Sequence, residues 1–219
     1  MATLAPLYER VGDAHREFHC CDTGFLVRTT GVRADAAVTT ARDTVVSLER
    51  QLNAFDDTSA VSRLNNEGAV TNTHVAQVVR RGLEYLDRTD GVFDIHQGQV
   101  EQDLKAFLRG DSDSPPEAFD TGTVHIDGNR VTTDVALDLN GLAKGYIVDQ
   151  TAQALAGLAR RGFVSGGGDM SPPTGPVAIE SPYGDATPLK VLDTDWAVAT
   201  SGGYRRERDG TDHVYDPTT

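Results

Sequence analysis

The sequence predicts an α+β fold in which helices pack on mainly antiparallel sheets. Three features lead to this prediction: apolar residues alternate over short segments, they recur every three or four positions over longer ones, and Asp-Gly pairs separate short segments. With 219 residues, 38% of them hydrophobic, the chain can bury one sizeable core. Because no internal repeat or long linker stands out, we expect residues 1–219 to form a single unit.

The N-terminal half is expected to hold long helices and one strand. Residues 4–18 carry apolar side chains at roughly helical spacing, and residues 25–30 show the alternation of a strand. An amphipathic helix then runs from Ala37 to Phe55. Thr73 is expected to cap a further helix, which ends near Gly91.

The C-terminal half is expected to alternate strands, turns and one helix. Residues 110–122 are rich in Asp, Ser and Pro, which is typical of a mobile loop. The elements expected after it are a hairpin around Asp127-Gly128, a strand over 135–139, a helix over 142–158, a strand at 163–164, a strand over 196–200 and a hairpin around Asp209-Gly210.

The charge limits the partners. The net charge of −13 argues against nucleic acid or an anionic membrane surface, since both require a basic face. No apolar run reaches the length of about 18 residues that a membrane span needs, so a cytoplasmic protein is expected. Asp far outnumbers Glu, and Lys105, Lys144 and Lys190 are the only lysines. This composition suggests a halophilic protein that needs salt to fold.

Two cysteines and two histidines lie close together near the N-terminus. Cys20 and Cys21 are adjacent and are too close to bridge without strain, so we expect no disulfide. His15 and His19 are four residues apart, but no second pair of Cys or His lies at metal-ligand spacing. Surface or packing roles are therefore favoured for both histidines.

A lysine near a helix start is the first candidate binding residue. Asn140-Gly141 breaks the predicted strand, and Lys144 follows in the first turn of the next helix. A cation opposes the helix dipole at this end, so a phosphate-like group bound between the lysine and unpaired N–H groups would explain it. A solvated lysine that happens to lie near a helix start is the alternative.

Two further polar clusters could take part in chemistry. Residues 165–170 contain three consecutive glycines followed by Asp169, which predicts a turn. The backbone amides of such a turn can approach phosphate oxygens. A plain flexible loop is the alternative. Ser201, His213 and Asp216 resemble a hydrolase triad in composition, but Gly-x-Ser-x-Gly is absent and nothing marks an oxyanion hole. Acyl transfer is therefore not the preferred reaction.

Six polar or glycine-containing segments follow one another along the chain: Leu52–Asn65, Gly91–Asp94, Asp138–Asp149, Val164–Asp169, Ala199–Gly202 and His213–Thr218. Each motif is weak alone, but the order of the set is specific. Taken together, these segments resemble the motifs of the ApbE-type FAD:protein FMN transferases.

The resemblance implies an FAD site and a magnesium ion. It places Phe55 against the flavin and Cys21 where the family often has a flavin-contacting methionine. Gly141 would offer a backbone carbonyl to Mg²⁺. The other residues implied to bind FAD are Val92, Phe93, Asp94, Asp138, Lys144 and Tyr215.

The sequence departs from the family pattern at several positions. His96 replaces a usual Thr, and Gly98-Gln99 replaces Gly-Pro. The family has an Ala-Asp-x-x-x-Thr motif beyond the Asp-Pro segment, which would supply two further magnesium ligands, and no such motif follows Asp216-Pro217 in this sequence. We therefore expect either a fragment or a chain that lacks part of the catalytic apparatus.

The implied reaction is Mg²⁺-dependent transfer of FMN from FAD to a Thr or Ser hydroxyl of an acceptor protein, with release of AMP. Lys144 would neutralise the pyrophosphate, and His213 is the first candidate for accepting the hydroxyl proton, with Asp169 second. FAD hydrolysis to FMN and AMP, and FAD binding without turnover, are the alternatives.

Overall fold

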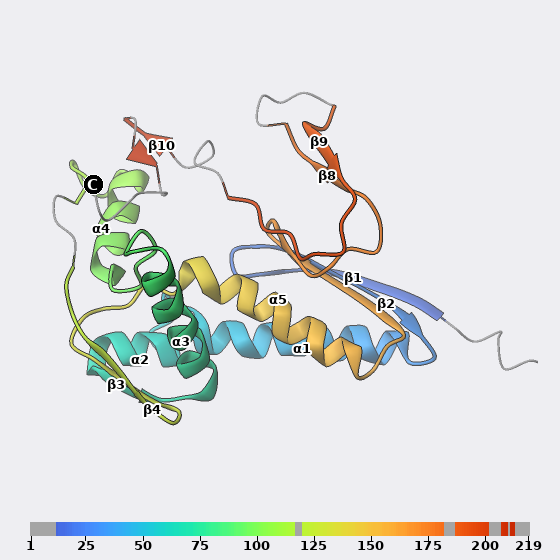
Figure 1. The fold of residues 1–219 in the computed structure, drawn as a ribbon, viewed down its shortest axis with the longest axis horizontal. Helices are drawn as coiled ribbons and strands as arrows, with labels where there is room; N and C mark the ends of the chain where they lie inside the picture. The colour runs from blue at the N-terminus through green and yellow to red at the C-terminus, as the bar shows by residue number, and fades with distance from the viewer. Residues whose placement is uncertain (1–11, 117–119, 182–186, 202–206, 210, 213–219) are drawn as a thin grey trace, which may run out of the picture. The chain divides into compact units, whose positions relative to one another are not determined.

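The computed structural model describes residues 12–116, 120–181, 187–201, 207–209 and 211–212, and it divides into two compact units (Figure 1). The first unit holds residues 1–49 and 144–200, and the second holds residues 50–143 and 201–219. Two of the three boundaries fall inside helices, α1 (Ala34–Leu52) and α5 (Asn140–Ala156), and the third lies between residues 200 and 201. The α+β class predicted from the sequence is confirmed.

The first unit is built on a four-stranded antiparallel sheet in the order β1-β2-β6-β7. Phe25, Val27 and Thr29 alternate along β2 as buried residues, and Leu155 of α5 packs against Gly162 of β6. Figure 1 shows α1 and α5 running along this sheet. The strands are β1 (Gly12–Cys20), β2 (Thr23–Gly31), β6 (Arg161–Gly166) and β7 (Asp169–Met170), and a separate hairpin joins β8 (Val177–Ile179) to β9 (Lys190–Leu192).

The helical spacing over residues 4–18 is misleading, because Gly12–Cys20 is a strand; residues 1–11 lie outside the described part of the chain. Phe18 faces Phe25 across the β1–β2 pair, with the two rings stacked at 5.7 Å. Most of β1 is exposed, and its charged side chains suit an edge strand. Long-range pairing with β2 therefore overrides the local spacing.

The second unit combines three helices with a small antiparallel sheet in the order β3-β5-β4. The turn at Gly128, with φ of 55°, joins β4 to β5 and confirms the hairpin predicted there. The elements are α2 (Ala60–Glu67), β3 (Ala69–Thr71), α3 (Thr73–Arg88), α4 (Gly98–Arg109), β4 (Val124–Asp127), β5 (Arg130–Thr133) and the short pair β10 (Glu207–Arg208) and β11 (Thr211–Asp212).

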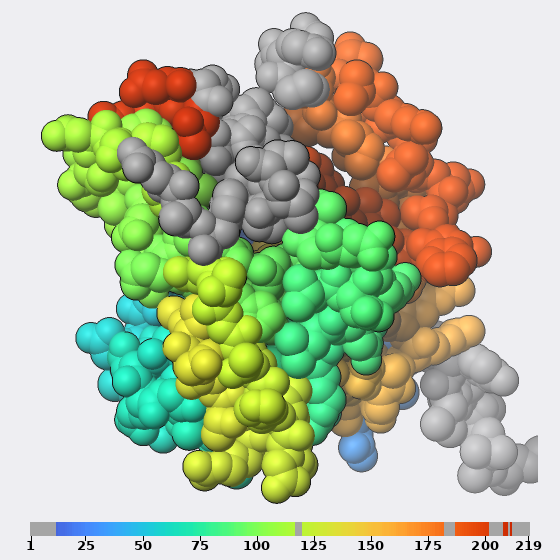
Figure 2. Space-filling view, turned by 60° about the vertical axis from the view of Figure 1, so that its left-hand side comes forward, coloured from blue at the N-terminus to red at the C-terminus, as the bar shows by residue number. Residues whose placement is uncertain are grey.

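Several predicted boundaries differ in this unit. Asn72, and not Thr73, caps α3, because its side-chain oxygen accepts from the N–H groups of His74 and Val75. The sequence reasoning also missed helices α2 and α4. Figure 2 shows β10 lying on α4, where Arg208 stacks on the Phe107 ring at 4.6 Å.

The strand predicted over residues 135–139 does not form. The side chain of Asn65 accepts from the Leu137 N–H and donates to the Leu137 carbonyl, so it takes the place of a neighbouring strand. The Ala136 carbonyl accepts from Gly98, and Asp138 donates to the Ile95 carbonyl. Because these groups satisfy the backbone, the extended segment needs no ladder.

The strand predicted over residues 196–200 is reduced to one isolated bridge between Val198 and Met170. In the described residues of the second predicted hairpin, only β10 and β11 pair, and His213 lies outside those residues. None of the helices in the described ranges is both long and apolar enough to cross a membrane.

Candidate functional site

The predicted site residues fall in both units, and each group is described within its own unit. Cys21, Lys144 and Asp169 belong to the first unit. Phe55, Val92, Phe93, Asp94, Asp138 and Gly141 belong to the second unit. His213 and Tyr215 lie outside the described residues.

In the first unit, Lys144 is held at the predicted glycine turn. Its ammonium donates to the Gly167 carbonyl at 2.8 Å and lies 3.5 Å from an Asp169 carboxylate oxygen. The lysine and the acid are only partly exposed, at 30% and 19% of their side chains. The structure therefore brings together a cation, a carboxylate and a glycine turn that the sequence predicted separately.

The turn itself needs glycine for two reasons. Gly167 and Gly168 have φ of 54° and 94°, in the left-handed region, and they join the paired residues Gly166 and Asp169. A Cβ on Gly166 would lie 2.5 Å from the Phe25 ring. The plain flexible loop is thus not the right description, because the turn is packed and paired on both sides.

The start of α5 differs from the predicted anion site. The helix begins at Asn140, so Lys144 is its fifth residue. The first N–H, of Asn140, donates to the Asp138 carboxylate, and those of Leu142 and Ala143 donate to the Leu139 carbonyl. Three of the first four N–H groups are therefore already bonded within the chain, and an anion here would depend on the lysine.

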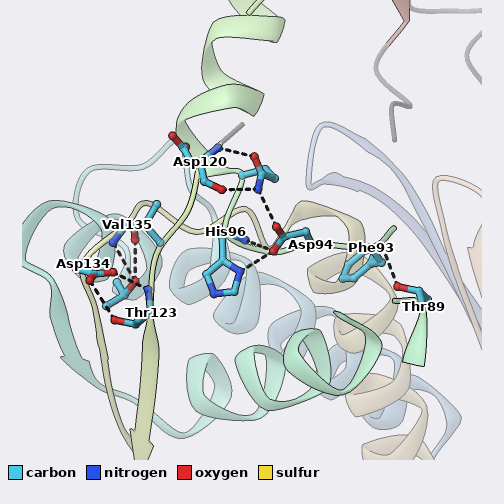
Figure 3. A network of polar contacts seen from close by, with 10 residues as sticks. Thr89, Phe93, Asp94, His96, Asp120, Thr123, Asp134 and Val135 are labelled. Carbon is cyan, nitrogen blue, oxygen red and sulfur yellow. Dashed lines mark hydrogen bonds and ion pairs between the residues drawn. The ribbon is translucent and has the colours of Figure 1, made fainter. Parts of the chain in front are cut away.

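In the second unit, Asp94 is the centre of a polar network, shown in Figure 3. One carboxylate oxygen accepts from the His96 backbone N–H at 2.9 Å and contacts His96 Nδ1 at 2.6 Å. The other accepts from the Gln97 amide at 2.7 Å. Because a carboxylate only accepts, His96 Nδ1 carries the hydrogen.

Gln97 extends this network to the segment before β4. Its amide donates to the Asp120 carbonyl and its oxygen accepts from the Asp120 N–H. One Asp120 carboxylate oxygen is buried without a partner in the structure. Asp94 thus fixes the loop that follows Phe93. The Asp94 carboxylate has roughly four lone-pair sites, and three of them accept hydrogen bonds.

Phe93 lies against the first turn of α5. Its N–H donates to the Thr89 hydroxyl, and its ring meets Tyr85 edge-on at 5.9 Å. A Cβ on Gly141 would lie 3.2 Å from the Phe93 ring, so the small residue permits this close approach. Val92, beside it, is half exposed.

The Asp138 carboxylate is packed among neighbouring groups and hydrogen-bonded to Asn140. It accepts from the N–H and the side-chain amide of Asn140, at 2.9 and 2.6 Å. Burial raises its pKa above the usual value of 3.8, and the charge of Glu101 adds to the rise, while the Asn140 bonds and Lys105 oppose it. The residue as a whole is only half buried, but its carboxyl group is packed away from water.

Sequence reasoning missed one charged pair. Lys105 Nζ lies 4.6 Å from the centre of the Phe55 ring and 2.7 Å from a Glu101 carboxylate oxygen. Phe55 is nevertheless 62% exposed. The four-residue spacing of Glu101 and Lys105 was the available signal, and it was missed because α4 was not predicted.

Metal ligands are sparse in the described part of the chain. No group of three or more His, Cys, Asp or Glu side chains there could hold a metal ion. His15 and His19 lie on the exposed strand β1 and belong to no such group. Gly141, the predicted carbonyl ligand, lies in the first turn of α5.

The comparisons with known proteins agree with this architecture. A model of the ApbE family matches residues 22–219. A search of curated proteins gave no significant match. Among solved structures, the chain is similar to the ApbE protein from Thermotoga maritima, with a TM-score of 0.81 and 21% identity, covering 95% of this chain and 77% of that one.

Two other solved structures are similar over comparable lengths. The flavin transferase ApbE from Vibrio cholerae gives a TM-score of 0.73 at 20% identity, with 95% of this chain and 77% of that one covered. The flavinyl transferase ApbE from Pseudomonas stutzeri gives 0.78 at 23% identity, with coverages of 95% and 75%. Such identities establish the fold, and the family match extends over most of the sequence: the chain belongs to the ApbE family.

Proposed function

We propose that this protein is a flavin transferase that moves FMN from FAD to a Thr or Ser hydroxyl of an acceptor protein and releases AMP. The observation that carries the proposal is the arrangement of Lys144, Gly167 and Asp169, because it fixes a cation at a glycine turn. Solved structures with the same fold are named flavin transferases. Phosphoryl transfer depends mainly on positioning and charge neutralisation, which this arrangement suits.

The bond changes are as follows. The acceptor hydroxyl oxygen attacks the phosphorus on the FMN side of the pyrophosphate, and the bond from that phosphorus to the bridging oxygen breaks. AMP leaves with the bridging oxygen, and FMN remains on the acceptor through a phosphoester. Lys144 would neutralise charge on the pyrophosphate, and His213 or Asp169 would take the hydroxyl proton.

Asp169 has the weaker case as the proton acceptor. Its carboxylate lies 3.5 Å from the Lys144 ammonium and is therefore already engaged in an ion pair. His213 therefore stays the first candidate. Asp169 is better suited to holding Lys144 in place.

The flavin ring would contact residues of the second unit. Phe55 and Val92 are exposed apolar residues there, and Phe93, Asp94 and Asp138 are held by internal contacts. Cys21 and Tyr215 complete the proposed flavin-binding set.

The proposal includes Mg²⁺, but the described residues supply only part of a magnesium site. The described residues supply one oxygen donor of the expected kind, the Gly141 carbonyl, and no cluster of acidic ligands. A full ligand set therefore does not follow from them. When bound, Mg²⁺ would neutralise phosphate charge.

Replacing Lys144 tests the proposal. We expect Lys144→Ala to lower the rate of AMP release from FAD by about 100-fold or more, because a charge-stabilising donor is lost. Lys190→Ala, at an exposed lysine of β9, is the matched control and should keep the wild-type rate. An unchanged rate in Lys144→Ala would remove the assigned role.

A further inference from the structure

The outer edge of strand β1 is unpaired in the part of the chain that the structure describes. β1 lies at one end of the four-stranded sheet and pairs with β2 alone (Figure 1). It is nine residues long, and six of the first eight have exposed side chains. An unpaired edge of this length is a template for another strand.

The hydrogen bonds of β2 show which residues of β1 face this edge. The carbonyls of Gly24 and Thr30 accept from N–H groups just beyond the two ends of β6, so even-numbered residues of β2 bond on the β6 side. Odd-numbered residues of β2 therefore bond to β1, where their partners are even-numbered. The backbone groups that point outward belong to the odd-numbered residues of β1, which are Asp13, His15, Glu17 and His19.

The same four residues match themselves when β1 is paired with a second copy of itself. Along the strand their exposed side chains alternate between acid and histidine. With Arg16 on the two-fold axis, Asp13 lies opposite His19 of the second copy, and His15 lies opposite Glu17 of the second copy. Symmetry repeats both pairs, so every outward position faces a complementary group. A histidine ring N–H can donate to a carboxylate whether or not the ring is charged.

The neighbouring registers lack this match. An axis at His15 would place Asp13 opposite Glu17, and an axis at Glu17 would place the two Glu17 side chains opposite each other; like charges in such positions are destabilising. A shift by one residue would bring opposite faces of the sheet together. Charges on an edge strand usually prevent pairing, but here they select one register. The cost is on the other face, where the two Arg16 side chains meet at the axis.

We propose that two copies of this chain associate through β1, antiparallel and with Arg16 on the two-fold axis, so that their two sheets become continuous. Each of the four outward pairs would exchange two backbone hydrogen bonds, about eight in all. The contact is symmetric and occupies the β1 edge of both copies, so assembly stops at the dimer. The net charge of −13 opposes association in dilute buffer, and salt screens this repulsion.

The first test measures the dimer dissociation constant by sedimentation of the full chain in molar KCl. His15→Glu puts two acids opposite each other in both central pairs and should weaken the dimer by about 10-fold or more. Adding Glu17→His to this variant exchanges the two groups, restores complementary pairs and should recover most of the affinity. A wild-type chain that stays monomeric up to about 100 µM, assembles beyond the dimer, or gives a double variant no tighter than the single one would overturn the proposal.

Cross-linking tests the register separately. In a chain with Cys20→Ser and Cys21→Ser, Arg16→Cys would place two thiols on the axis, with Cα atoms about 4.5 Å apart, which a disulfide can bridge. Asp13→Cys in the same background is the matched control, because the two copies of residue 13 would lie about 20 Å apart along the strands. Circular dichroism in molar KCl checks that both variants fold.

We expect mild oxidation to link the Arg16→Cys chains into covalent dimers and to leave the Asp13→Cys chains unlinked. Equal linking of both variants, or of neither, would overturn the proposed register. Neither result bears on flavin transfer, because none of the proposed site residues lies in β1.

Discussion

At the scale of single residues, Asp138 carries the clearest pH signature in the structure. Burial raises its pKa in the folded state above 3.8. A raised carboxyl pKa means that the fold is favoured while the group is protonated, below its unfolded pKa, and that this stability is lost as the pH rises through the folded pKa. At neutral pH the charged Asp138 therefore costs stability.

This cost can be measured with Asp138→Asn. The amide oxygen can still accept from Asn140, but the variant has no charge to bury. We expect the variant to gain stability over wild type as the pH rises from about 4 to 8, because only wild type ionises. The free energy of unfolding of both proteins, measured across this range in high salt, gives the difference. A difference that stays constant with pH would show that Asp138 is not the titrating group.

Lys105 is the second residue whose role can be tested directly. Lys105→Met keeps the side-chain stem but removes the cation over Phe55 and leaves Glu101 without its partner. We expect a loss of about 1 kcal/mol in the free energy of unfolding. The double variant with Glu101→Gln should recover part of that loss, and Lys105→Arg should retain most of the stability. Equal losses in Lys105→Met and Lys105→Arg would point to packing and not to charge.

At the scale of elements, local turn chemistry could be predicted and distant partners could not. The hairpin at Asp127-Gly128 follows from its own sequence. The segment 135–139 alternates like a strand, but its partner is the side chain of Asn65, 72 residues away. Helix α4 begins where Gly98 approaches the Ala136 backbone, so closely that a Cβ would lie 2.6 Å from the carbonyl carbon. No local pattern reveals these contacts.

In the candidate site too, local motifs could be predicted from the sequence, whereas contacts between distant residues could not. Lys144 and the glycine turn were each recognised from sequence, but their hydrogen bond spans 23 residues and required the fold. Glu101 and Lys105 remained hidden because they lie on the unpredicted α4. His213 and Tyr215 remain predictions.

The cap of α3 gives a test at this scale. Asn72→Ala removes an acceptor for two N–H groups at the helix start, so we expect a loss of about 1 kcal/mol of stability in chemical unfolding. Asn72→Asp keeps the acceptor and adds a charge that the helix dipole favours, although it loses the bond to Gln51. It should therefore lose less. If both variants lose the same amount, the Gln51 bond and not the cap would explain the effect.

At the scale of the whole molecule, the net charge of −13 predicts a need for salt. Repulsion among the acids is screened to about 3 Å at molar ionic strength, and it extends much further in dilute buffer. We expect the melting temperature to fall steeply when KCl is reduced from molar to millimolar levels. An unchanged melting temperature and unchanged circular dichroism without salt would contradict this.

The central claim is that this ApbE-family chain transfers FMN, and acceptor-dependent AMP release tests it most directly. The purified chain would be incubated with FAD and Mg²⁺ in molar KCl, with and without a threonine-bearing acceptor domain, and with EDTA as a control. We predict AMP that requires both metal and acceptor, with FMN appearing on the acceptor by mass. AMP without an acceptor would make the protein an FAD pyrophosphatase, and intact FAD bound to folded protein in the presence of the acceptor would contradict catalysis altogether.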